Sequence, residues 1–105
     1  MERKKWEIWL AEVKYEESDD MKKRPVLIVG EKDTFIISLK MTSHEKRHDS
    51  DYSLKHWQRA GLDKETVVRT SKICRLVESD FIHKLGRISE HDILEIQKIV
   101  LNERT

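Results

Sequence analysis

Short apolar runs separated by polar segments predict that the first half of the chain is built from strands. Residues 8–13 form an aromatic and branched run, residues 25–29 are apolar without a break, and residues 35–41 form a third run. An unbroken apolar run suits a strand buried on both faces, so residues 25–29 are expected at the centre of a sheet. We place a turn at residues 30–33, and such a short connection predicts that the second and third strands pair as a hairpin.

The second half has a different pattern. Residues 43–51 are polar throughout and predict an exposed loop, and a turn is expected around residues 60–62. Residues 67–76 are long enough for a bent strand, and residues 81–88 are expected to add a short one. An acidic stretch at residues 16–20 has no periodicity and predicts a mobile loop.

The end of the chain has the period of an amphipathic helix. Ile93, Ile96 and Val100 recur at helical spacing. Three further apolar residues widen this stripe: Leu94, Ile99 and Leu101. Ser89 and Asp92 have the spacing of a capping box, with Asp in the place of the preferred Glu. Several short strands followed by one helix predict a mainly β protein, a small barrel with a helical lid, forming one domain over residues 1–105.

Composition narrows the classes of function. The chain has 21 basic and 20 acidic residues, so no overall positive field argues for nucleic acid and any basic surface must be local. The one cysteine, Cys74, cannot form an intramolecular disulfide and lies in an apolar alternation typical of a core. Apolar runs are far shorter than the ~20 residues that cross a bilayer, and no signal-peptide core follows the charged N-terminus. We therefore expect a soluble, cytoplasmic protein without a membrane partner.

Two groups of polar residues at strand ends could bind a phosphate. Lys22, Lys23 and Arg24 precede the second strand, and a guanidinium suits phosphate because it donates two parallel hydrogen bonds. Thr42 and Ser43 follow the third strand and supply two hydroxyl donors. If these strands pair, Arg24 and Thr42 become neighbours and form a phosphate cradle. Each feature alone is more typical of solvated charge or of an ordinary strand end.

The polar loop and two aromatic residues offer further chemistry. Histidine side chains exchange protons readily near neutral pH, so His44 and His48 could move a proton from a ribose hydroxyl, with Arg47 beside them as a phosphate contact. No ligand cluster with metal spacing accompanies them, so no metal site is expected. Tyr52 and Trp57 could stack on unpaired bases, and packing in the core is the equally weighted alternative.

Three early segments stand out when they are taken together: WEIWLA at 6–11, KRPVLIV at 23–29 and ISLKMTS at 37–43. In this order they resemble the PemK/MazF family, the toxin halves of bacterial toxin–antitoxin pairs. Residues 71–76 and 85–89 also resemble the family's last strands and helix. The chain departs from the family pattern at Trp6, at Lys40-Met41, at Gly30-Glu31-Lys32 and in the loop at residues 44–52.

The resemblance implies a compact SH3-like barrel of the PemK/MazF/CcdB-like kind with a C-terminal helix. It also implies a homodimer, a cognate antitoxin as partner, and cleavage of single-stranded RNA without metal or cofactor, by attack of the ribose 2′-hydroxyl on the adjacent phosphate. The family's key arginine falls on Arg24 and its key threonine on Thr42, helped by Ser43. The less specific candidates are His44 and His48 for catalysis. Five residues are candidate RNA contacts: Lys22, Lys23, Arg47, Tyr52 and Trp57.

A second hypothesis keeps the same fold without catalysis, because fold alone does not fix function. The chain would then be a binding module, either a gyrase-type inhibitor or a decayed toxin that binds only RNA or its antitoxin. Arg24 beside Thr42 discriminates between the two hypotheses, because a gyrase binder has no need of a phosphate cradle.

Overall fold

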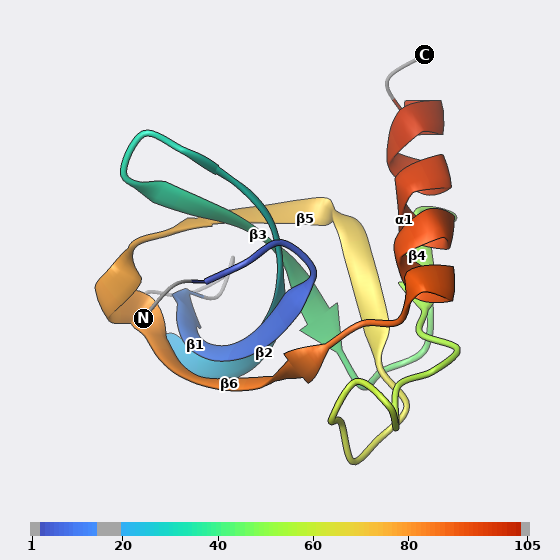
Figure 1. The fold of residues 1–105 in the computed structure, drawn as a ribbon, viewed down its shortest axis with the longest axis horizontal. Helices are drawn as coiled ribbons and strands as arrows, with labels where there is room; N and C mark the ends of the chain where they lie inside the picture. The colour runs from blue at the N-terminus through green and yellow to red at the C-terminus, as the bar shows by residue number, and fades with distance from the viewer. Residues whose placement is uncertain (1–2, 15–19, 104–105) are drawn as a thin grey trace.

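The computed structural model describes residues 3–14 and 20–103, whose strands form one antiparallel six-stranded sheet (Figure 1). In chain order the elements are β1 (Glu7–Lys14), β2 (Met21–Lys32), β3 (Phe35–Thr42), β4 (Asp51–Ser53), β5 (Val67–Leu76), the 3₁₀ turn η1 (Glu78–Asp80), β6 (Phe81–Arg87) and α1 (Glu90–Glu103). The spatial order of the strands is β4-β5-β3-β2-β1-β6. Of the acidic stretch predicted to be mobile, only Asp20 lies within the described residues.

The sheet curls strongly, with α1 standing to one side of it (Figure 1). Its two end strands are β4 and β6, and no ladder between described residues joins them. The mainly β architecture with one C-terminal helix is confirmed, whereas closure into an SH3-like barrel is not.

The predicted hairpin of β2 and β3 is confirmed, but the turn predicted at residues 30–33 is wrong for residues 30–32, which lie in β2. The ladder continues to Lys32 opposite Phe35, so the turn consists of Asp33 and Thr34. Asp33 adopts φ 57°, a left-handed conformation that Asp tolerates. Gly30 lies inside β2, where the register shifts by one residue. A glycine at a bulge has the same sequence signature as one at a turn, which explains the error.

The long bent strand predicted for residues 67–76 is also confirmed. The pairing of β3 with β5 passes from Leu39 opposite Ile73 to Lys40 opposite Arg69, which leaves three residues of β5 without partners in this ladder. Such an insertion bends a strand, and Figure 1 shows β5 turning sharply. The short strand β4 was not expected, because it lies at the end of a segment that reads as a polar loop.

Apolar residues pack on both faces of the sheet. Along β2, Leu27 belongs to the core cluster that contains Ile96 of α1, whereas Val26 and Ile28 belong to a second cluster with Trp9 of β1. Alternate residues of a strand point to opposite faces, so the second cluster lies on the face away from the helix. All three β2 residues are at most 2% exposed, which confirms the strand buried on both faces.

The C-terminal helix begins where the sequence predicts. The backbone N–H of Asp92 donates to the Ser89 hydroxyl at 3.2 Å, so Ser89 caps the helix that starts at Glu90. Ile93 and Ile96 are buried against the sheet. Leu94 and Leu101 are more than half exposed, so the apolar stripe is wider than the surface that the sheet covers.

Candidate nucleic-acid interface

Arg24 and Thr42 lie in adjacent strands near the same end of the sheet. The ladder of β2 and β3 includes Val26 opposite Lys40, and continuing this antiparallel register by two residues sets Arg24 opposite Thr42. Residues opposite each other in an antiparallel pair present their side chains on the same face. Arg24 is exposed and Thr42 is partly exposed, so both side chains are accessible to a ligand. The two residues of the predicted phosphate cradle therefore share one face.

The Thr42 hydroxyl is oriented by the chain that follows it. The backbone N–H of His44 donates to Thr42 Oγ1 at 3.2 Å. Because the oxygen accepts this bond, its own proton is directed elsewhere and suits donation to a ligand oxygen. Ser43, between them, is exposed. The strand end thus offers one fixed hydroxyl and a second beside it.

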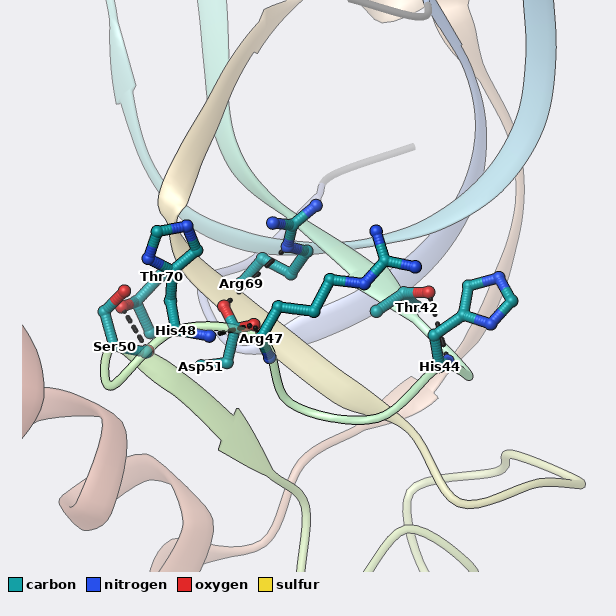
Figure 2. A network of polar contacts seen from close by, with 8 residues as sticks. All are labelled: Thr42, His44, Arg47, His48, Ser50, Asp51, Arg69 and Thr70. Atoms are coloured by element: carbon teal, nitrogen blue, oxygen red, sulfur yellow. Dashed lines mark hydrogen bonds and ion pairs between the residues drawn. The ribbon is translucent and has the colours of Figure 1, made fainter.

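The loop that continues from Thr42 is folded back by a buried carboxylate (Figure 2). Asp51 Oδ2 accepts the backbone N–H groups of Arg47 and His48 at 3.0 and 3.3 Å, and Asp51 is only 1% exposed. Arg69 Nε lies 3.7 Å from Asp51 Oδ1. The Thr70 hydroxyl donates to the Ser50 carbonyl at 2.6 Å. The loop is therefore bound to β5, and the prediction that Asp51 is exposed is wrong.

The two candidate histidines lie at opposite ends of this loop (Figure 2). The His44 ring is beside Thr42, whereas the His48 ring is on the side of Thr70. The Arg47 side chain extends from the loop back in the direction of Thr42. All three of His44, Arg47 and His48 are exposed. The structure thus brings His44 and Arg47, rather than His48, towards the Thr42 end.

The three cations before the buried run do not form one cluster. They lie within β2 rather than ahead of it, so the predicted strand start at Pro25 is wrong. Lys22 pairs with Val13 of the second core cluster, whereas Lys23 pairs with Glu12. Because alternate side chains point to opposite faces, Lys22 shares the face of Arg24 and Lys23 does not.

Tyr52 and Trp57 pack against the core cluster under the helix. The Tyr52 hydroxyl donates to Asp92 Oδ1, and the Asp92 carboxylate also accepts the backbone N–H groups of Lys55 and His56 at 2.9 and 3.0 Å. Burial by itself raises the pKa of Asp92, but these hydrogen bonds outweigh it and hold that pKa below its usual value. Burial and the neighbouring carboxylate raise the pKa of the Tyr52 phenol. The described contacts give Tyr52 an anchoring role, and its stacking on RNA stays a prediction.

The cysteine, a metal site and a membrane span are the other features on which the sequence makes predictions. Cys74 is buried, and burial raises the pKa of its thiol to about 11. Among residues 3–14 and 20–103, no three His, Cys, Asp or Glu side chains are grouped as a metal site would require. Over the same residues, no helix has the length and apolar character needed to cross a membrane.

Solved structures of other proteins have a fold similar to that of this chain. The fold is similar to the Mycobacterium tuberculosis toxin MazF-mt6, with TM-score 0.73 and 17% identity over 91% of this chain and 93% of that one. It is also similar to an endoribonuclease in complex with its cognate antitoxin from a mycobacterial species, with TM-score 0.74 and 13% identity over 93% and 90% of the two chains. At these identities the likeness establishes the fold.

Sequence comparison goes further than the fold. No match was found among curated proteins. Residues 4–102, however, match a sequence model of PemK-like and MazF-like toxins, which covers nearly the whole chain in a single stretch. The chain belongs to the family of PemK-like, MazF-like toxins of type II toxin–antitoxin systems.

Proposed function

We propose that this chain is a toxin that acts as a metal-independent endoribonuclease on single-stranded RNA. The observation that carries the proposal is the register of β2 and β3. Continued two residues beyond the pair of Val26 and Lys40, it puts Arg24 and Thr42 on one face, where Arg24 is exposed and Thr42 partly exposed. An arginine and a hydroxyl directed at one point suit the charge of a phosphate. Family membership and the solved endoribonuclease of the same fold support the same class of activity.

In the proposed reaction the RNA supplies its own nucleophile. The ribose 2′-oxygen bonds to the adjacent phosphorus while the bond from phosphorus to the 5′-oxygen breaks, which leaves a 2′,3′-cyclic phosphate and a 5′-hydroxyl. The 2′-hydroxyl proton passes to a base, and the leaving 5′-oxygen takes up a proton. Arg24 stabilises the negative charge of the phosphorane, and Thr42, helped by Ser43, donates to a non-bridging oxygen.

His44 is the better of the two histidine candidates for the base. Its backbone is hydrogen-bonded to Thr42 Oγ1, and its ring lies beside Thr42 (Figure 2). An imidazole titrates near neutral pH and accepts a proton efficiently there. His48 lies at the other end of the loop, so a role for it in proton transfer is disfavoured.

The wider setting belongs to the same proposal. We propose that Lys22 and Arg47 contact RNA phosphates, because Lys22 shares the face of Arg24 and Arg47 extends towards Thr42. A cytoplasmic homodimer restrained by a cognate antitoxin fits the family, and one solved relative is an endoribonuclease bound to its antitoxin.

The test is cleavage of a long unstructured RNA in excess EDTA by the unaltered protein and by Arg24→Ala. A matching DNA strand is the substrate control, because it lacks the attacking 2′-hydroxyl. Arg75→Ala is the protein control, since Arg75 is an exposed arginine of β5 paired with Ile37, away from Thr42. We expect discrete RNA fragments from the unaltered protein and from Arg75→Ala only.

Two results would contradict the proposal. Full cleavage by Arg24→Ala would show that Arg24 has no part in the reaction. Intact RNA with every protein would favour the non-catalytic binding module, and inhibition of gyrase supercoiling would then be the next measurement.

A further inference from the structure

The face that carries Arg24 and Thr42 continues into a second group of cations. Lys40 is two residues before Thr42 in β3, so the two side chains share a face. Arg69 of β5 pairs with Lys40 on one side and with Asp51 of β4 on the other. Lys40 and Arg69 therefore lie directly across from each other, on the face of the proposed phosphate cradle.

Two further observations agree with this orientation. Arg69 Nε lies 3.7 Å from Asp51 Oδ1, which holds the guanidinium beside β4. Burial raises the pKa of the Cys74 thiol, and the positive charge of Lys40 acts against this rise. Cys74 belongs to the core cluster on the face away from the helix, which is the face that the register gives to Lys40.

The spacing of these cations suits a phosphate. Opposed residues in an antiparallel pair have Cβ atoms ~4.5–5.5 Å apart, so Lys40 and Arg69 can contact the same anion. Arg24 is the diagonal neighbour of Lys40, at ~7–8 Å. The buried Asp51 carboxylate lies at the Nε of Arg69 and holds this guanidinium at the face.

We propose that Lys40 and Arg69 form a second phosphate subsite, which binds the RNA phosphate next to the one held by Arg24 and Thr42. The inference rests on the proposed function, since it assigns a further part of the same RNA-binding face. The subsite lies two strand residues, or ~7 Å, from the cradle. Asp51 keeps Arg69 in place and, through the backbone of Arg47 and His48, ties the loop to the same point.

The test measures binding to a single-stranded RNA with 2′-O-methyl groups, which cannot be cleaved by the proposed reaction. Fluorescence anisotropy at several salt concentrations gives the slope of log K against log salt, which is about −0.7 for each phosphate contact with a single strand. We expect Lys40→Gln to make this slope shallower by about 0.7. Lys98→Gln, on the exposed surface of α1, has the same charge change and should leave the slope as it is.

Arg69 needs a paired design, because its loss leaves Asp51 buried without its ion-pair partner. The double variant Asp51→Asn/Arg69→Gln removes both charges, and the new amide oxygen can still accept the loop N–H groups. For this double variant, the slope of log K against log salt should also become shallower by about 0.7. Arg75→Gln is the control on the same strand and should leave the slope unchanged. Circular dichroism melting confirms that each variant is folded, and Lys40→Gln decides the question if the double variant is not.

The outcomes separate the two proposals. A protein that cleaves RNA normally, with unchanged slopes in both Lys40→Gln and the folded double variant, would overturn the second subsite alone. An unaltered protein that neither binds nor cleaves RNA would overturn both the subsite and the proposed function.

Discussion

Removal of the Asp92 carboxylate should destabilise the protein severely. Asp92 is 0% exposed and accepts hydrogen bonds from the Tyr52 hydroxyl, the Ser89 hydroxyl and the backbone N–H groups of Lys55 and His56. Asp92→Ala leaves these buried donors without a hydrogen-bond acceptor, and each buried donor without a partner costs ~1–3 kcal/mol. Because some donors will find water after relaxation, we expect a total loss of ~3–5 kcal/mol in the free energy of unfolding.

The assay is urea unfolding, in which the midpoint falls with the m-value unchanged if only the native state is affected. For a domain of this size, each 1 kcal/mol corresponds to ~4–8 °C in the melting temperature, so the loss should exceed about 12 °C. Glu90→Ala is the matched control. Glu90 is also an acidic residue in the first turn of α1, but it is exposed, so its removal should cost less than ~1 kcal/mol.

The pH dependence gives a second, independent readout. The pKa of Asp92 is lowered in the folded state, so its contribution is present above the unfolded value near 3.8 and is lost as the pH falls through the folded value. Asp92→Ala should therefore flatten the acid side of the stability profile. A loss below ~1 kcal/mol at neutral pH, or an unchanged acid profile, would refute the idea that this carboxylate joins the loop to the helix.

Two further predictions concern the packing of the β6 strand and the candidate base. A Cβ on Gly86 would lie 1.8 Å from the Ala60 carbonyl oxygen, so Gly86→Ala should cost ~2–3 kcal/mol in urea unfolding, whereas Gly30→Ala meets no atom within 4 Å and should cost much less. His44→Ala should slow RNA cleavage by ~10²–10⁴-fold. A larger loss in His48→Ala than in His44→Ala would reverse the assignment of the base.

Local patterns determined much of this structure. A short connection between two apolar runs predicts that β2 and β3 pair, which brings Arg24 and Thr42 to the same end of the hairpin. Their exact register depends on the bulge beside Gly30, which the pattern of the sequence did not predict. The unbroken apolar run of β2 predicts burial on both faces, and a capping residue followed by a 3.6-residue period predicts α1. These features depend on residues close together in the chain, which is why sequence reasoning can find them.

Only the tertiary structure decided which charged residues are buried and which cations share a face. Asp51 lies in a polar segment and Asp92 in the first turn of a helix, where carboxylates are usually exposed, yet both are almost fully buried. Asp92 accepts the backbone N–H of Lys55 from a distant segment, and Asp51 lies between its own loop and Arg69 of β5. Lys40 and Arg69 become neighbours through the register of β3 and β5, and the insertion in β5 that sets this register has no local signal. Sequence alternation tells which side chains share the face of a strand, but the partner across that face is chosen by the packing of the whole sheet.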